Sequence, residues 1–214
     1  TADTLGSKST AIGTFSLYTQ NFTTANDTFN TAVGYNSGAF VTTGTDNTLI
    51  GSLSGDAITD GNTNTAVGSY SLTTNQRGDR NTAIGHEALF TMNPSGDVDS
   101  LNTAVGYQSG RLLSTGVQNT IVGANAADAM TSGQNNVFVG YAAAGAGVVT
   151  GSSNIGIGVA VLGPLTSGDN NVAIGEDAGP GITSGSNNMC LGHDAGRTGS
   201  PGGGLTTSSD SIRV

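Results

Sequence analysis

A five-residue motif recurs along the whole chain and constrains the fold more than any other feature of the sequence. Residues 102–106 read Asn-Thr-Ala-Val-Gly, and the same five residues, or the same with Ile for Val, stand at 30–34, 64–68 and 81–85. Looser copies, which bring the total to eleven, start at residues 9, 47, 119, 136, 154, 171 and 188. Successive copies start about 17 residues apart, with three longer intervals, and a fixed period of this length is typical of stacked repeat architectures.

The positions of the motif, numbered from its Asn, predict a short strand. Position 4 is Val, Ile or Leu in all eleven copies, and position 2 is Thr in the first seven and Val, Ile or Met in the last four. Such a column predicts a strand with one buried face. Side chains of a strand alternate between its faces, so positions 2 and 4 share a face. We expect this face to line the inside of the coil.

Position 3 points the other way and carries no charged side chain. A strand with one solvated face would alternate apolar with polar residues, and this strand does not. We therefore expect position 3 to pack against another chain. Cys190 stands in this column, and as the only cysteine it permits no intrachain disulfide. The predicted oligomer interface consists of Ala32, Leu49, Ala66, Ala83, Ala104, Ile121, Phe138, Ala173 and Cys190.

The remaining positions predict how the coil closes. Position 5 is Gly in every copy, which indicates a bend with positive φ or a close backbone approach. Positions 6 to 9 are expected to form a second short strand, with a tightly packed Ser or Ala at position 8. A loop ending in a Gly-containing turn leads to the next Asn. The stacked Asn side chains either form a hydrogen-bonded ladder along the axis or simply suit a turn.

Together these features predict an all-β fold, a parallel β-roll or β-solenoid of about eleven 17-residue coils, packed side by side with another chain. The expected organisation is a polar lead-in at 1–8, the repeat roll at 9–197, and a Gly-rich linker with a C-terminal tail at 198–214. The net charge of −9 disfavours nucleic acid and anionic membranes as partners, because both bind basic surfaces. No apolar run approaches the roughly 18 residues that span a bilayer.

The motif also resembles repeats of known families. Asn-Thr-Ala-Val-Gly and Asn-Val-Ala-Ile-Gly, followed by Ser or Ala three residues later, are similar to the head repeats of trimeric autotransporter adhesins. The longer period of this chain, with Thr-Ser-Gly or Thr-Thr-Gly before the Asn, resembles repeats in bacteriophage tail fibres. The resemblance covers the repeats, which are about 85 to 90% of the chain. It implies left-handed parallel β-rolls, assembled as trimers and exposed at a cell surface or on a virion.

The residues that carry chemistry are few. His86 precedes Glu87 and His193 precedes Asp194, but neighbours on a strand are expected to point to opposite faces, so neither pair predicts a catalytic dyad. Carboxylates in the loops are expected to be solvated rather than to bind Ca²⁺. We expect no enzyme activity, no cofactor and no metal. The Thr column raises ice binding as an alternative, against which stand its expected inward orientation and its end at Thr120.

The expected function is a structural and adhesive fibre segment that presents loops to a host cell, outside the cell on a virion tail fibre or a cell surface. Partners would be two further copies of the chain and a glycan or protein receptor. The alternative is a self-assembling extracellular filament subunit. The candidate receptor contacts are Tyr35, Tyr107 and Tyr141 and, in a loop lengthened by an insertion, Met92, Asn93 and Pro94.

Overall fold

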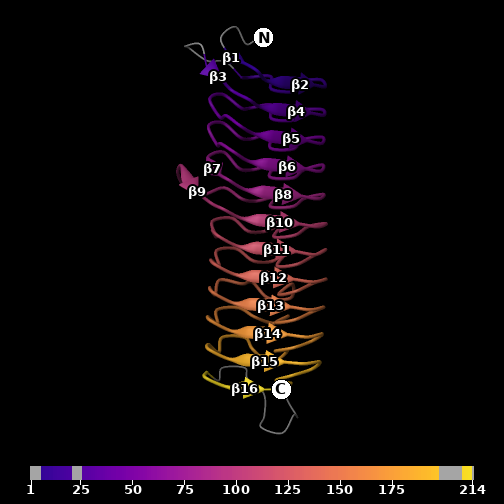
Figure 1. The fold of residues 1–214 in the computed structure, drawn as a ribbon, viewed down its shortest axis with the longest axis vertical. Helices are drawn as coiled ribbons and strands as arrows, with labels where there is room; N and C mark the ends of the chain where they lie inside the picture. The colour runs from indigo at the N-terminus through magenta and orange to yellow at the C-terminus, as the bar shows by residue number, and fades with distance from the viewer. Residues whose placement is uncertain (1–5, 21–25, 198–208, 214) are drawn as a thin grey trace.

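The computed structural model describes residues 6–20, 26–197 and 209–213, and in these ranges the chain forms a single parallel β-solenoid without helices (Figure 1). Each copy of the motif contributes one three-residue strand, and a two-residue strand follows the last copy. The column of strands runs β2 (Thr10–Ile12), β4 (Thr31–Val33), β5 (Thr48–Ile50), β6 (Thr65–Val67), β8 (Thr82–Ile84), β10 (Thr103–Val105), β11 (Thr120–Val122), β12 (Val137–Val139), β13 (Ile155–Ile157), β14 (Val172–Ile174), β15 (Met189–Leu191) and β16 (Ile212–Arg213).

These twelve strands form one parallel sheet in chain order, with β2 at one edge and β16 at the other. The repeat sets the register, since each position pairs with the same position in the next coil; Ala104, for example, pairs with Ile121. The predicted all-β parallel solenoid, with one coil for each copy of the motif, is thereby confirmed. The strand β16 adds a step beyond the eleven copies, because Ile212 pairs with Met189. Part of the predicted C-terminal tail therefore continues the sheet, while residues 198–208 lie outside the described ranges.

The predicted second strand at positions 6 to 9 is wrong. This segment is a series of turns, and its residues at positions 7 and 9 have left-handed backbone conformations, such as Asn36 (φ 53°) and Gly38 (φ 58°). An extended strand needs negative φ, so such residues turn the chain instead. The residue before each Asn is also left-handed in most coils, as at Asp46 (φ 58°). These repeated left-handed residues bend the chain back on itself and close each coil.

Glycine is required at position 5 for both of the predicted reasons, a positive φ and a close approach to another part of the backbone. The φ of Gly106 is +136°, and a Cβ on this residue would lie 2.6 Å from the carbonyl carbon and oxygen of Gly123 in the next coil. Real Cβ atoms do not approach backbone atoms so closely. The same approach recurs from coil to coil, for example between Gly34 and Gly51. The glycine column therefore allows neighbouring coils to stack at the spacing of a parallel sheet.

The predicted asparagine ladder is confirmed. The Oδ1 of Asn119 accepts hydrogen bonds from the backbone N–H of Asn136 (3.0 Å) and from its Nδ2 (3.2 Å). The Nδ2 of Asn119 donates in turn to Asn102 Oδ1 (3.1 Å) and to the carbonyl of Gly133 (2.9 Å). These asparagines are almost completely buried. Because a buried amide without partners is costly, the ladder ties each coil to the one before it and to its own loop.

The interior of the coil is lined by position 3, and the predicted assignment of the strand faces is wrong. In the main-sheet strands from β4 to β15 the middle residue is buried, while the residues on either side are half-buried or exposed. The residues predicted as an oligomer interface belong instead to the core of a single chain, each with 0% of its surface exposed: Ala32, Leu49, Ala66, Ala83, Ala104, Ile121, Phe138, Ala173 and Cys190. Side chains without exposed surface cannot contact a partner.

The space inside each coil explains why position 3 varies in size. Where position 3 holds a large side chain, position 9 of the same coil and of the preceding coil holds a glycine or an alanine. A Cβ on Gly38 or on Gly55 would lie 2.7 Å from a methyl carbon of Leu49, which fills both spaces. Where position 3 is Ala, as at Ala104, position 9 of the preceding coil supplies a buried Leu89. Large and small residues thus alternate across the core at nearly constant volume.

A third core column, at position 12, lies in the segment expected to be only a loop. It holds the buried side chains Val41, Ile58, Met92, Leu113, Met130, Leu165 and Ile182. Gly147 and two polar residues interrupt the column. Gln20 accepts a hydrogen bond from Asn30 Nδ2 (3.0 Å), and Asn75 both donates to the carbonyl of Gly78 and accepts from its N–H (2.8 Å each). Both are therefore satisfied within the core.

Two coils carry a four-residue insertion, and each insertion adds a small parallel pair of strands outside the main sheet. In the first, β1 (Gly6–Ser7) pairs with β3 (Asn26–Asp27); in the second, β7 (Gly78–Asp79) pairs with β9 (Val98–Asp99). Figure 1 shows that β7 and β9 project from the side of the rod away from the main column of strands. The described part of the predicted lead-in therefore also belongs to the fold.

Candidate functional site

The outward face of the main sheet is an uncharged stripe along the rod. We call the side chains at positions 2 and 4 of the main-sheet strands from β4 to β15 the apolar stripe. Position 2 contributes Thr31, Thr48, Thr65, Thr82, Thr103, Thr120, Val137, Ile155, Val172 and Met189, and position 4 contributes Val33, Ile50, Val67, Ile84, Val105, Val122, Val139, Ile157, Ile174 and Leu191. With strands about 4.8 Å apart, the stripe is roughly 45 Å long.

The stripe is exposed to a degree unusual for such residues. Ile50 is 39% exposed and Ile174 is 42% exposed in the single chain. Single exposed aliphatic residues need no explanation, but position 4 forms an unbroken row of Val, Ile and Leu, and a row of this length is typical of a surface that binds a partner. The sheet geometry also makes the stripe regular, since every strand presents the same two positions. The stripe therefore replaces position 3 as the candidate interface.

The predicted receptor contacts divide into exposed and buried residues. Tyr35 and Tyr107 are each 52% exposed and Tyr141 is 59% exposed, so all three rings are accessible. Met92 is completely buried in the position 12 column, and Pro94 is also buried, so neither is available to a receptor. An insertion suggests a free loop, whereas the first residues of this one continue the core. Asn93 is exposed, and its Oδ1 accepts the backbone N–H of Gln76 (3.3 Å).

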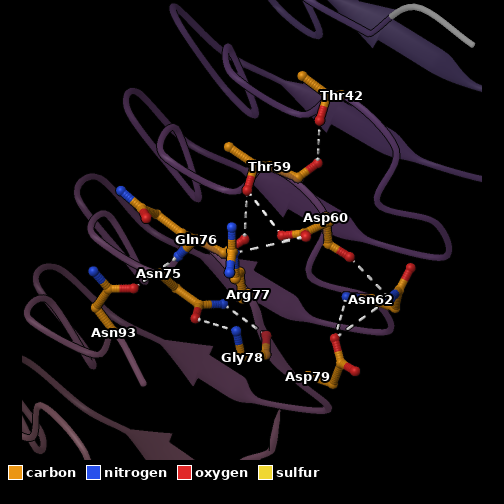
Figure 2. Close-up of polar contacts among 10 residues, drawn as sticks. All are labelled: Thr42, Thr59, Asp60, Asn62, Asn75, Gln76, Arg77, Gly78, Asp79 and Asn93. Carbon is orange, nitrogen blue, oxygen red and sulfur yellow. Dashed lines mark hydrogen bonds and ion pairs between the residues drawn. The ribbon is translucent and has the colours of Figure 1, made fainter. Parts of the chain in front are cut away.

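Figure 2 shows the polar contacts that connect the coils near this insertion. Thr42 Oγ1 donates to the carbonyl of Thr59 (3.0 Å), and Thr59 Oγ1 is within 3.2 Å of the carbonyl of Gln76, one coil further. On the other side of the loop, Asn62 donates its backbone N–H to Asp79 Oδ1 (2.6 Å). These contacts run from coil to coil beside the asparagine ladder. They satisfy backbone groups of the loops and hold this edge of the rod in register.

The two histidines lie in turns, and each has a close neighbour. His193 Nδ1 lies 3.5 Å from Asp194 Oδ2, so the expectation that these neighbours point apart is wrong, because they stand in a turn and not in a strand. The Asp194 carboxylate also accepts from Arg197 (2.9 Å), which engages it in a surface ion pair. His86 stacks on Tyr107, with ring centroids 5.6 Å apart. Across the described residues, no three His, Cys, Asp or Glu side chains gather as metal ligands would.

Asp56 is the acidic residue most affected by its surroundings. Burial raises the pKa of Asp56 to about 6 from its usual 3.8, against hydrogen bonds from the backbone that lower it. Its Oδ1 has no hydrogen-bond partner among the described residues. Between pH 4 and pH 6 the folded chain therefore binds more protons than the unfolded chain, so stability falls as the pH rises through this range.

We expect Asp56→Asn to raise the free energy of unfolding at pH 7 by about 1 to 2 kcal/mol, a value reduced from the full shift because the side chain is only partly buried. The gain should shrink as the pH falls towards 4, where the wild-type carboxyl is protonated in the folded state. Urea denaturation at pH 4, 5, 6 and 7 measures this. Asp46→Asn, at an exposed position, serves as the control. Equal stability of wild type and Asp56→Asn at pH 7 would contradict the prediction.

Comparisons of the chain with protein-family models, with curated proteins and with solved structures find no match. The class of the protein is therefore defined by its fold and its surfaces, as a parallel β-solenoid compatible with the β-roll repeat proteins. In the described ranges, no helix is long and apolar enough to cross a membrane.

Proposed function

We propose that the chain is a structural and adhesive fibre segment, in which three copies pack side by side through their apolar stripes. The observation that carries the proposal is the stripe itself: twenty neighbouring positions without a charged side chain remain exposed or half-buried in the single chain. A second copy of the chain is the occupant that matches it best, because a partner with the same spacing of strands meets the stripe in register along its whole length.

Three copies are proposed because the motif resembles the heads of trimeric autotransporter adhesins and repeats of phage tail fibres. We place the protein outside the cell, on a virion tail fibre or at a cell surface, where a rigid rod carries contact surfaces to a host. The net charge of −9 and the uncharged stripe support this arrangement, since apolar faces would be buried at the axis and charges would remain at the periphery.

The test is the mass of the intact chain by light scattering at several concentrations. We expect three times the 21.1 kDa of the single chain, independent of concentration. The double variant Val67→Glu with Val105→Glu should dissociate the trimer, because each substitution would bury a carboxylate without a partner. Both positions face outward in the single chain, so its circular dichroism should remain unchanged.

Ser69→Glu is the control. It adds one carboxylate, against two in the double variant, one residue beyond the strand-ending glycine, at position 6, where another coil already carries Glu176. This variant should stay trimeric. A wild-type chain that is monomeric at all concentrations would rule out the trimer.

A self-assembling extracellular filament is the second candidate. The strand β2 forms an open edge of the sheet, and its Ile12 is 59% exposed. Open edges of parallel sheets present unpaired backbone groups that can pair with another chain. A mass that grows with concentration would favour the filament over the discrete trimer.

The threonine column favours a different use of the stripe, binding to ice. The expectation that the threonines face inward is wrong, which removes one of the two arguments against this function. Thr31, Thr48 and Thr65 present hydroxyl and methyl groups at regular steps on the sheet. The trimer would cover these groups, so the two functions exclude each other. A monomer that shows thermal hysteresis would favour ice binding.

A further inference from the structure

The two coils with insertions are copies of one larger unit. Their corresponding residues differ by 72 in number: Lys8 forms an ion pair with Asp27 (2.7 Å), and Arg80 forms an ion pair with Asp99. In both cases the cation follows the first strand of the small pair and the carboxylate belongs to the second. The chain therefore repeats not only from one coil to the next but also, over this part, every four coils.

The same larger unit repeats a pair of aromatic residues, of which Tyr18, Tyr35 and Tyr107 are exposed and Phe90 is half-buried. Tyr18 corresponds to Phe90, at position 10 of the coil with the insertion, and Tyr35 corresponds to Tyr107, at position 6 of the following coil. Position 10 is aromatic in these two coils alone; the other coils have Ala39, Asp56, Thr73, Arg111, Asp128, Gly145, Gly163, Pro180 and Arg197. The solenoid core does not need these rings, because the coils without them close in the same way.

The first aromatic cluster lines a cleft. Phe15 lies edge-on to Tyr18, with ring centroids 5.2 Å apart, and also contacts Tyr35 at 6.4 Å. The cleft has a volume of about 370 Å³, and its lining combines exposed rings with an amide and a hydroxyl: Phe15, Tyr18, Thr19, Asn36, Ala39 and Phe40. None of these residues is charged, although the chain has a net charge of −9.

The second aromatic cluster has the same pair of rings with different neighbours. His86 stacks almost parallel on Tyr107, at an interplanar angle of 12°, and Tyr70 contacts both His86 (6.1 Å) and Phe90 (6.4 Å). Next to these rings, Gln108 donates a hydrogen bond to Glu87 (2.8 Å). Rings beside hydrogen-bonding groups thus occur at both ends of the four-coil unit, with an amide and a hydroxyl at the first cluster and an amide and a carboxylate at the second.

We propose that these two clusters are a pair of binding subsites for a neutral polysaccharide that follows the rod. This inference deepens the proposed adhesive function and rests on it. A sugar ring has an apolar C–H face and a rim of hydroxyls, so it matches a surface where rings are flanked by hydrogen-bonding groups. The uncharged cleft in an acidic chain favours a neutral sugar, because an anionic one would be repelled.

The spacing of the subsites indicates a polymer and not a single sugar. Four coils separate the two clusters, which is about 19 Å at the spacing of a parallel sheet. One chain with several sugar units can engage both clusters at once, and the second contact is then intramolecular. Two contacts that are each weak can thereby bind the polymer strongly together.

The experiment is affinity electrophoresis of the full chain in native gels that contain soluble mannan, galactan or dextran, with anionic alginate as the charge control. We expect retardation by at least one neutral polymer and none by alginate. Tyr18→Thr with Tyr35→Ser removes two rings from the first cluster, and Phe90→Thr with Tyr107→Ser removes two rings from the second. Each new residue already stands at the same position of another coil, as Thr73 and Ser69 do, so the fold should tolerate it.

Each double variant should weaken binding about tenfold or more, because it abolishes the bivalent contact, and the combined variant should migrate as in a gel without polymer. Val159→Ser is the control, since Val159 is an exposed apolar residue at position 6 outside both clusters, and it should bind as wild type does. Equal retardation of the combined variant and wild type, or no retardation by any neutral polymer, would overturn the inference.

Light scattering of the same samples separates this result from failure of the trimer. A trimer that does not bind refutes the subsites alone, and a monomer that binds refutes the trimer alone.

Discussion

Gly106→Ala is expected to destabilise the rod by about 3 kcal/mol or more, although it adds a single methyl group. The φ of Gly106 is +136°, a conformation that side chains with a Cβ rarely adopt, and the new Cβ would lie 2.6 Å from backbone atoms of Gly123. A flexible side chain could move aside, but the backbone of the next coil is held by the sheet. The strain and the clash therefore add, and the stacking of β10 on β11 should weaken.

Urea denaturation followed by circular dichroism measures the effect, at one protein concentration because assembly contributes to apparent stability. Gly96→Ala is the control, since no atom lies within 4 Å of the position of its Cβ. The control should change the free energy of unfolding by no more than about 0.5 kcal/mol. If Gly106→Ala were as stable as the control, the glycine column would have no role in the spacing of the coils.

Asn119→Ala should have a similar effect for a different reason. Removal of the amide leaves the backbone N–H of Asn136 without its acceptor and the carbonyl of Gly133 without its donor. Asn136 Nδ2 loses one of its acceptors and keeps the carbonyl of Gly151 (3.0 Å). Each unpaired buried group costs about 1 to 3 kcal/mol, so a loss of about 3 to 5 kcal/mol is expected in the free energy of unfolding. The loss is local, but each coil supports its neighbours, so it should reduce the stability of the whole stack.

The first coil supplies the control for this prediction. Ser9 replaces Asn at the start of the ladder, and its Oγ accepts the backbone N–H of Asn30 (3.2 Å). Asn119→Ser should therefore retain part of the ladder and be more stable than Asn119→Ala, with wild type the most stable of the three. The same denaturation assay ranks them. Equal losses for Ala and Ser would show that volume, and not hydrogen bonding, makes the asparagine necessary.

The proposed functions use different sides of the coil. The apolar stripe belongs to positions 2 and 4 of the strand, whereas the aromatic clusters belong to positions 6 to 11, beyond the glycine bend. A trimer that covers the stripes would leave the aromatic clusters at the periphery. Assembly and attachment can then be changed by separate substitutions. The charge variants test assembly, and the aromatic variants test attachment.

The sequence by itself predicted the period of the coil, the all-β class, the parallel register, the glycine bends and the asparagine ladder. Each of these depends on a requirement of the backbone that admits few residue types. Gly106 adopts a positive φ, and Asn119 satisfies buried N–H and C=O groups. Glycine and asparagine therefore recur at these positions from coil to coil. The extra strand β16 was not predicted, because Arg213 stands at position 3, where all eleven copies of the motif have an uncharged residue.

Only the tertiary structure decided which face of the strand lies inside and where the rings gather. The β-branched residues at position 4 suggested the interior, but the coil is narrow, and its interior takes Ala104 with Leu89 in one place and Leu49 with Gly38 and Gly55 in another. Such complementarity depends on volumes contributed by different coils, which no single motif contains. The alternation of strand side chains then places Thr103 and Val105 outside, where their β-branched shape suits the sheet and leaves the stripe for a partner.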